Sequence, residues 1–162
     1  MKRLAHRPGF TLVELMIAVV IGSVLFSGGL AAYRGFGDRQ TLKQAGATFQ
    51  SNLRLFQQKA LSGKKPSECL AGDVFEGVEV SYVNETSYLA TPICQVERPG
   101  GETFILPEEV EFLGVGWDTI FFPVLRSELA GAQTITLSLT SFSYDVIIEP
   151  SGVIRGEMRE IP

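Results

Sequence analysis

This 162-residue chain contains an uncharged apolar run from Leu15 to Ala32, which limits the folds that are open to it. The run is about as long as a helix that crosses the hydrocarbon core of a bilayer. A short basic leader with Lys2, Arg3 and Arg7 precedes it, and a single acid, Glu14, stands at its start. Because a carboxylate beside a membrane span is costly and usually faces a partner, Glu14 is a candidate functional residue.

The order of these features differs from that of a secretory signal, in which the apolar region precedes a cleavage site of small residues. Here the only plausible cleavage site, after Gly9, comes before the apolar run, so the run would stay in the mature protein. Taken without its neighbours, Glu14 would be an acid at headgroup level beside a plain membrane anchor.

The stretch Gly9-Phe10-Thr11-Leu12-Val13-Glu14, between the basic leader and the apolar run, resembles the N-terminus of type IV pilins and pseudopilins. The resemblance implies that a prepilin peptidase cuts between Gly9 and Phe10 and methylates the new amine on Phe10. It also implies that Glu14 pairs with the Phe10 amine of a neighbouring subunit, since either group alone would be costly in an apolar filament core. Pro8 departs from the family pattern, in which Lys or Gln is common at that place.

We therefore expect four segments: a leader peptide at residues 1–9, a transmembrane and filament-core helix at 10–33, an amphipathic stem helix at 34–62, and an extracytoplasmic β-rich head at 66–162. Basic residues flank both sides of the apolar run in equal number, so the positive-inside rule does not decide the orientation. The cysteines and the family resemblance place the leader in the cytoplasm and the head outside.

The stem carries apolar residues at steps of three and four, which is typical of one buried helix face; they are Leu42, Ala45, Phe49, Leu53, Phe56 and Ala60. The polar residues expected on the opposite side are Gln44, Gln50, Arg54, Gln57 and Lys59. Ser62 to Pro66 supplies a glycine and then a proline, so the helix should end near Leu61. Gly35-Phe36-Gly37 predicts a flexible joint or a simple bend.

Beyond Pro66 the apolar pattern alternates, which predicts strands at 78–82, 88–93, 103–106, 110–115, 119–125, 133–139, 144–149 and 153–158. Asn84-Glu85 and Pro150-Ser151-Gly152 predict turns. No second helix separates the strands, so we expect an α+β fold with a long helix packed on one or two antiparallel β-sheets. The strands around Pro150 also resemble the H-type pseudopilin branch, with a generic minor pilin as the alternative.

Cys69 and Cys94 both fall in the head, where an extracytoplasmic location would let a disulfide persist. A bridge between them would close a loop of about 26 residues, stabilise the fold by about 3 kcal/mol, and clamp the base of the hairpin between Val78 and Ile93. Two free buried thiols are the alternative. Without a histidine beside them, two cysteines do not make a zinc site.

Charge is unevenly distributed along the chain. Residues 34–65 hold seven basic side chains and one acid, whereas residues from Pro66 onward hold 16 acids and four arginines. The simple interpretation is solubility for the head and attraction to anionic lipid for the stem. The alternative is attraction between basic stems and acidic heads of successive subunits. The acidic head argues against binding to nucleic acid, because phosphate contacts need a basic surface. The loop at Lys64-Lys65 is the one remaining candidate for such binding.

The chain lacks the residues on which enzymatic catalysis usually depends. The only histidine, His6, lies in the leader, so a processed chain has no Ser/His or Cys/His pair. A solvated acidic surface explains the head's carboxylates more simply than glycoside hydrolysis does. Four of them are candidate calcium ligands but lack the spacing of a dedicated calcium loop; they are Glu108, Glu109, Glu111 and Asp118. We expect no enzyme, no metal and no cofactor. Trp117, Phe121 and Phe122 should lie in the core, with a partner surface as the alternative.

The sequence thus predicts a structural subunit, a minor pilin or pseudopilin, of a type IV pilus or a type II secretion filament. The implied partners are other pilin or pseudopilin subunits, the prepilin peptidase and an inner-membrane assembly platform. The chain would begin as a single-pass inner-membrane protein and enter a pilus or pseudopilus. Residues expected to pack helix on helix are Val13, Leu15, Met16, Val19, Val20 and Val24. A membrane-tethered binding domain that does not polymerise is the alternative, and a tethered enzyme is the third.

Overall fold

In the part of the chain that the structure describes, a single helix, α1 (Leu12–Leu61), precedes the strands. The structure is a computed structural model that describes residues 11–96, 99–114 and 116–160, and within residues 26–34 the backbone alone. The chain divides into two compact units, Met1–Gly37 and Asp38–Pro162. We call the second the globular unit.

The helix ends where its sequence predicts. Gly63 adopts a left-handed conformation, with φ 61°, and its N–H donates to the carbonyl of Ala60 at 3.1 Å. A glycine in this conformation is a common helix terminator because it has no Cβ to clash. Residues 35–37, where the sequence predicts a flexible joint or a bend, are helical.

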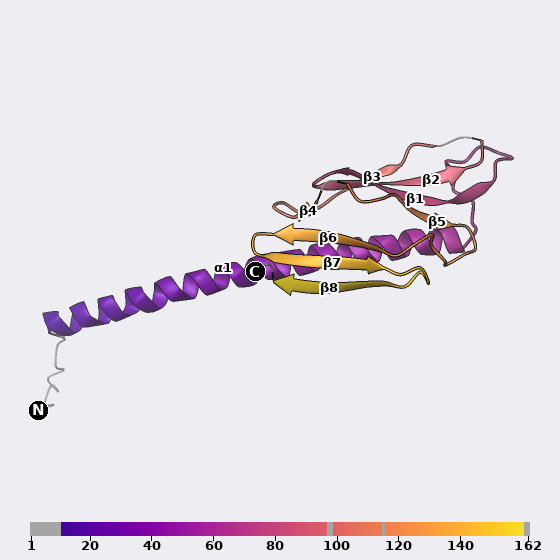
Figure 1. The fold of residues 1–162 in the computed structure, drawn as a ribbon. Helices are drawn as coiled ribbons and strands as arrows, with labels where there is room; N and C mark the ends of the chain where they lie inside the picture. Colours follow the sequence, from indigo (N-terminus) through magenta and orange to yellow (C-terminus); the bar gives the residue numbers. More distant parts are fainter. Residues whose placement is uncertain (1–10, 97–98, 115, 161–162) are drawn as a thin grey trace, which may run out of the picture. The chain divides into compact units, whose positions relative to one another are not determined.

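The eight strands of the described residues form two antiparallel sheets, which confirms the α+β expectation (Figure 1). The first sheet has the order β3-β2-β1-β5 and contains β1 (Phe75–Asn84), β2 (Ser87–Cys94), β3 (Glu102–Ile105) and β5 (Ile120–Pro123). The second has the order β4-β6-β7-β8 and contains β4 (Glu111–Phe112), β6 (Gln133–Leu139), β7 (Phe142–Ile148) and β8 (Ile154–Glu160). Each predicted strand overlaps an observed one, although β4 is much shorter than expected.

Both predicted turns connect neighbouring strands. Between β1 and β2, the Asn84 Oδ1 atom accepts a hydrogen bond from the backbone N–H of Thr86 at 3.0 Å. Between β7 and β8, Gly152 has φ 84°, and its N–H donates to the carbonyl of Glu149 at 2.9 Å. An Asn side chain that accepts a backbone N–H and a glycine with a positive φ are both common in turns.

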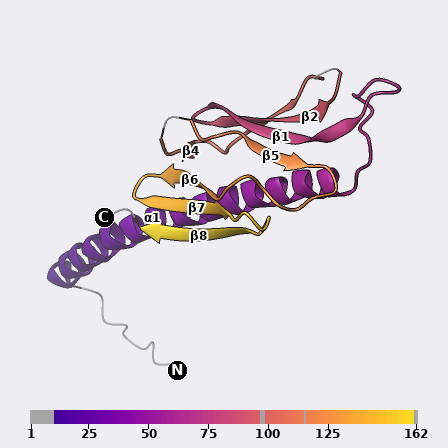
Figure 2. The same ribbon diagram turned by 45° about the vertical axis from the view of Figure 1, so that its right-hand side comes forward.

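The last part of α1 packs against both sheets of the globular unit, which Figures 1 and 2 show from two directions. The ring of Phe49 lies 4.9 Å from that of Tyr88 on β2 and 5.5 Å from that of Phe112 on β4. The predicted apolar face is buried throughout, namely Leu42, Ala45, Phe49, Leu53, Phe56 and Ala60. One helix face therefore closes the core of two sheets.

The polar face of this helix segment does not simply face solvent, and here the sequence-based expectation was incomplete. Gln50 and Arg54 both donate hydrogen bonds to the carbonyl of Ile154, at 3.0 and 2.7 Å. Gln57 donates to the carbonyl of Gly152 at 2.8 Å. Because β8 is an edge strand, Gln50 and Arg54 satisfy a carbonyl that an open edge would leave for another chain, while Gln57 satisfies one in the turn before β8.

Two of the three aromatic residues expected in the core are placed as predicted. Phe122 is buried and Trp117 is partly buried against the core, but Phe121 is 39% exposed. The correction follows from the alternation of side chains along β5, which turns Ile120 and Phe122 inward and Phe121 outward.

A buried tyrosine connects α1 to the first sheet. The Asn52 side-chain amide donates a hydrogen bond of 2.8 Å to the hydroxyl oxygen of Tyr88, which is 2% exposed. Burial raises the pKa of Tyr88 above its ordinary value of 10.0, because the anionic form would lose its hydration. The hydroxyl therefore remains protonated at neutral pH.

Close helix-to-sheet contact depends on Gly46, where a Cβ atom would lie 2.2 Å from Cδ1 of Tyr144. We expect Gly46→Ala to destabilise the globular unit by about 1–3 kcal/mol, because overpacking outweighs the gain of about 1 kcal/mol in helix propensity. Chemical denaturation of the full chain in detergent would measure the change.

The matched control is Gly37→Ala, since a Cβ at that helical position meets no atom within 4 Å. This variant should keep or slightly raise the stability. A Gly46→Ala protein as stable as the Gly37→Ala protein would show that Tyr144 moves aside without cost.

Candidate functional site

Thr11 caps the first turn of α1. Its hydroxyl oxygen accepts a hydrogen bond from the backbone N–H of Glu14 at 3.2 Å, and its carbonyl accepts one from Leu15 at 3.1 Å. Thr-x-x-Glu is the sequence of a capping box, so the pattern Thr11-Leu12-Val13-Glu14 contained this signal, although sequence reasoning did not use it. Glu14 thus lies in the first turn of the helix, where an acid interacts favourably with the helix dipole.

The two processing residues, Gly9 and Phe10, lie outside the described residues. The structure therefore places Glu14 but not the amine that it is expected to meet.

The helix that follows Glu14 exposes apolar side chains in every direction. All six residues expected to pack helix on helix are exposed, by 61–66% of their surface; they are Val13, Leu15, Met16, Val19, Val20 and Val24. Leu12, Ile17, Ile21 and Leu25 are exposed as well. Soluble proteins rarely expose a contiguous apolar surface of this size, so this helix segment requires a covering partner or lipid.

Within the part of the chain that the structure describes, no helix is both long and apolar enough to cross a membrane. Of the expected membrane segment, residues 10–33, Phe10 and the side chains of residues 26–33 fall outside the description.

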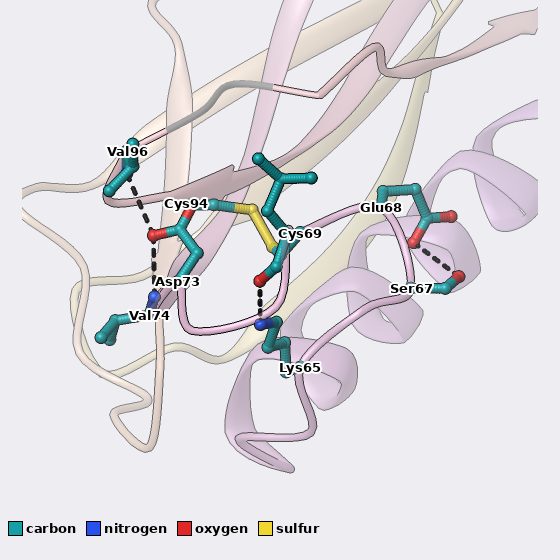
Figure 3. The surroundings of a disulfide bond; sticks show 9 residues. Lys65, Ser67, Glu68, Cys69, Asp73, Val74, Cys94 and Val96 are labelled. Atoms are coloured by element: carbon teal, nitrogen blue, oxygen red, sulfur yellow. Dashed lines mark hydrogen bonds between the residues drawn. A yellow bond between two sulfur atoms is a disulfide. The ribbon is translucent and has the colours of Figure 1, made fainter.

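A disulfide joins Cys69 to Cys94, as the sequence predicted (Figure 3). It links the loop after α1 to the end of β2, with the two Cα atoms 5.9 Å apart. A carboxylate oxygen of Asp73 accepts hydrogen bonds from the N–H groups of Val74 and Val96, at 2.8 and 3.0 Å. The Lys65 ammonium donates to the carbonyl of Leu70. These contacts hold the loop against the base of the hairpin.

We expect the double substitution Cys69→Ser with Cys94→Ser to lower the free energy of unfolding by about 2–4 kcal/mol, because the bridge spans a separation of 25 residues. Equilibrium denaturation of the full chain in detergent would measure this loss. Ser67→Ala is the control, since it alters the same loop but keeps the bridge. Equal stability of the double variant and wild type would contradict a structural role for the disulfide.

The acids weighed as calcium ligands, Glu108, Glu109, Glu111 and Asp118, are all exposed. Across the described ranges, no three His, Cys, Asp or Glu side chains gather in a way that could hold a metal ion. Among these acids, Glu109 has a left-handed backbone, with φ 70°, in the short loop between β3 and β4.

Comparison with family models gave one match, in which residues 4–30 fit the prokaryotic N-terminal methylation motif. Comparison with curated proteins and with solved structures gave no match. The matched residues include Glu14, the Thr11 cap and most of the exposed apolar segment. The chain therefore carries a prokaryotic N-terminal methylation motif, which supports its resemblance to type IV pilins and pseudopilins.

Proposed function

We propose that the chain is a structural subunit, a minor pilin or pseudopilin, of a type IV pilus or a type II secretion filament. The observation that carries this proposal is the position of the methylation motif, which leads directly into an exposed apolar helix with one acid in its first turn. A helix of this kind is suited to a filament core, where copies of itself cover its side chains.

In this proposal a prepilin peptidase removes residues 1–9 and methylates the amine of Phe10. Residues 10–33 first anchor the chain as a single-pass protein of the inner membrane, with the globular unit outside. An assembly platform in that membrane then moves the subunit into the filament. Lipid tails are as apolar as leucine, so association of such helices depends on close packing and on polar pairs rather than on the hydrophobic effect.

Glu14 has its role at this step. As the helix packs against its neighbours, the carboxylate needs a cation, and the Phe10 amine of an adjacent subunit supplies one. Because an unpaired charge in an apolar core costs several kcal/mol, this pair would fix the axial register of one subunit on the next.

A membrane-tethered binding domain that does not polymerise is the second candidate. It is favoured by a groove of about 780 Å³ in the globular unit, which includes Lys59, Lys64 and Lys65 in its lining. In this candidate the chain keeps its membrane anchor but Glu14 has no partner. It therefore predicts an uncut leader and a chain that tolerates Glu14→Ala.

The test is recovery of the chain in filaments. Cells that make the chain with its peptidase and assembly machinery would be sheared, and the filament and membrane fractions compared by immunoblotting. We expect to find the chain in the filament fraction only when the peptidase is present. Filaments that extend from the cell surface would indicate a type IV pilus and not a type II secretion filament. A chain confined to the membrane as a monomer under both conditions would contradict the proposal.

A further inference from the structure

The turn between β1 and β2 carries a chemical pattern that assembly of a filament does not use. Residues 84–86 are Asn-Glu-Thr, which matches the acceptor pattern for N-linked glycosylation, Asn-x-Ser/Thr with x other than Pro. The other asparagine of the chain, Asn52, is followed two residues later by Arg54, and its amide donates to the hydroxyl oxygen of Tyr88. Asn84 is therefore the asparagine of this chain that can accept a sugar.

Hydrogen bonds within the turn fix the orientation of the Asn84 side chain. Its Oδ1 atom accepts hydrogen bonds from the Thr86 N–H at 3.0 Å, from the Thr86 hydroxyl at 3.1 Å and from the Ser87 hydroxyl at 2.8 Å. The amide nitrogen, Nδ2, lies on the other branch of the planar amide and donates no hydrogen bond to any residue that the structure describes. Because Asn84, Glu85 and Thr86 are all exposed, this nitrogen is accessible from solvent.

Backbone hydrogen bonds hold the turn at the surface of the globular unit. The carbonyl of Glu85 accepts a hydrogen bond from the N–H of Phe112 at 2.7 Å, and that of Thr86 accepts one from the N–H of Leu106 at 2.8 Å. Phe112 and Leu106 are buried, so the turn rests on the core. A group attached to Asn84 would extend into solvent without displacing any core side chain.

Three apolar side chains around this turn are exposed. Val83, which precedes Asn84 on β1, is 49% exposed, and Ile105, which pairs with Ser87 across β2 and β3, is 77% exposed. Leu113, which directly follows β4, is 59% exposed. Exposed apolar side chains that lie close together favour association with other chains, and a bulky hydrophilic group beside them would oppose it.

We propose that Asn84 is a site of N-linked glycosylation. The donor is an oligosaccharide linked to a lipid pyrophosphate, and the enzyme is a membrane oligosaccharyltransferase. The Asn84 Nδ2 atom forms a bond to C1 of the first sugar, and the bond from C1 to the pyrophosphate oxygen breaks. The lipid pyrophosphate leaves with the electron pair of that bond, and Nδ2 gives one proton to a base of the transferase, so nothing is oxidised or reduced.

The attached glycan shields the exposed side chains of Val83, Ile105 and Leu113. It thereby gives this part of the globular unit a hydrated surface, which limits association of one filament with another. The inference rests on the proposed function, because that function places the globular unit outside the membrane, on the side where the transferase meets its acceptor.

The test is intact-mass analysis of the full chain, recovered from membranes of the cells in which it occurs. We expect the mass of the chain without residues 1–9, with one methyl group and a whole number of sugar residues added. Fragmentation of the peptide that contains Asn84 should place the sugar on that residue. A chain without added sugar, or with sugar only on another residue, would overturn the inference.

Three variants test the acceptor pattern itself. Asn84→Asp should lose all the added sugar, because it keeps the acceptor oxygen of the turn but has no amide nitrogen. Thr86→Val should also lose it, because the hydroxyl of the pattern is missing from a side chain of similar shape. Ser87→Ala is the matched control, since it removes a hydrogen bond to the same Asn84 oxygen but leaves the pattern intact, and it should keep the sugar.

Sugar on the Asn84→Asp chain, or equal loss in the Thr86→Val and Ser87→Ala chains, would overturn the inference. The same mass spectra distinguish it from the proposed function. Retention of residues 1–9 would reject the proposed function, whereas a processed and methylated chain without sugar would reject only the glycosylation of Asn84.

Discussion

Replacing Glu14 by Gln is expected to lower incorporation of the chain into filaments by about 100-fold or more. Removal of one partner from a buried ion pair typically costs about 3–5 kcal/mol, because the other charge is left unpaired, and each 1.4 kcal/mol is about a factor of ten. In the proposed filament the charge left unpaired is the amine of Phe10. Quantitative immunoblotting of sheared filaments against total membrane protein would measure the change.

The Gln substitution distinguishes pairing with a neighbouring subunit from a local role of Glu14 at the start of α1. It can still complete a capping box, so a Glu14 that served only to start α1 would tolerate Gln. Thr11→Ala is the converse control, because it removes the observed cap, at a cost of about 1 kcal/mol, and keeps the charge. We expect the Thr11→Ala protein to assemble and the Glu14→Gln protein not to assemble. The reverse pattern would show that Glu14 acts through the helix start.

Phe49→Ala is expected to lower the free energy of unfolding of the globular unit by about 3–5 kcal/mol. Phe49 is 1% exposed, and its ring contacts Tyr88 and Phe112 as well as Trp117, which lies 6.3 Å away. The substitution would leave a cavity where α1 meets both sheets. A loss of this size is a large part of the stability of a small domain. Denaturant titration of the full chain in detergent, followed by Trp117 fluorescence, would measure it.

Phe121→Ala is the matched control, since it removes the same side chain from a position that is 39% exposed. Its cost should be about 1 kcal/mol or less. If Phe49→Ala unfolds the protein completely, Phe49→Leu should still show a loss of about 1–2 kcal/mol, because Leu fills part of the space. Equal losses for Phe49→Ala and Phe121→Ala would contradict the assigned position of the core.

Local patterns were sufficient to predict much of this fold. The spacing from Leu42 to Ala60 identified the buried face of the helix, and the alternation from Thr134 to Leu139 identified β6 with its observed core. Gly63 and Gly152 marked a helix end and a turn because few other residues adopt those backbone angles at low cost. In each case the signal lies within a few residues of the structure that it specifies.

Long-range contacts could not be predicted in the same way. The helical pattern places Gln50 and Arg54 away from the apolar face but cannot show that the edge of β8 lies there. The pairing of Gly46 with Tyr144 likewise depends on how the helix meets the second sheet. The cap at Thr11 is different, because its capping-box signal was present in the sequence. Phe121 also followed the alternation of its strand, which was a better guide than its aromatic character.

In the proposed function, the N-terminal motif is processed and directs the chain into a filament. Intact-mass analysis of the full chain, recovered from membranes of cells with and without a prepilin peptidase, tests its first step most directly. We expect loss of residues 1–9 and the gain of one methyl group only when the peptidase is present. An unprocessed chain in both kinds of cell would contradict it.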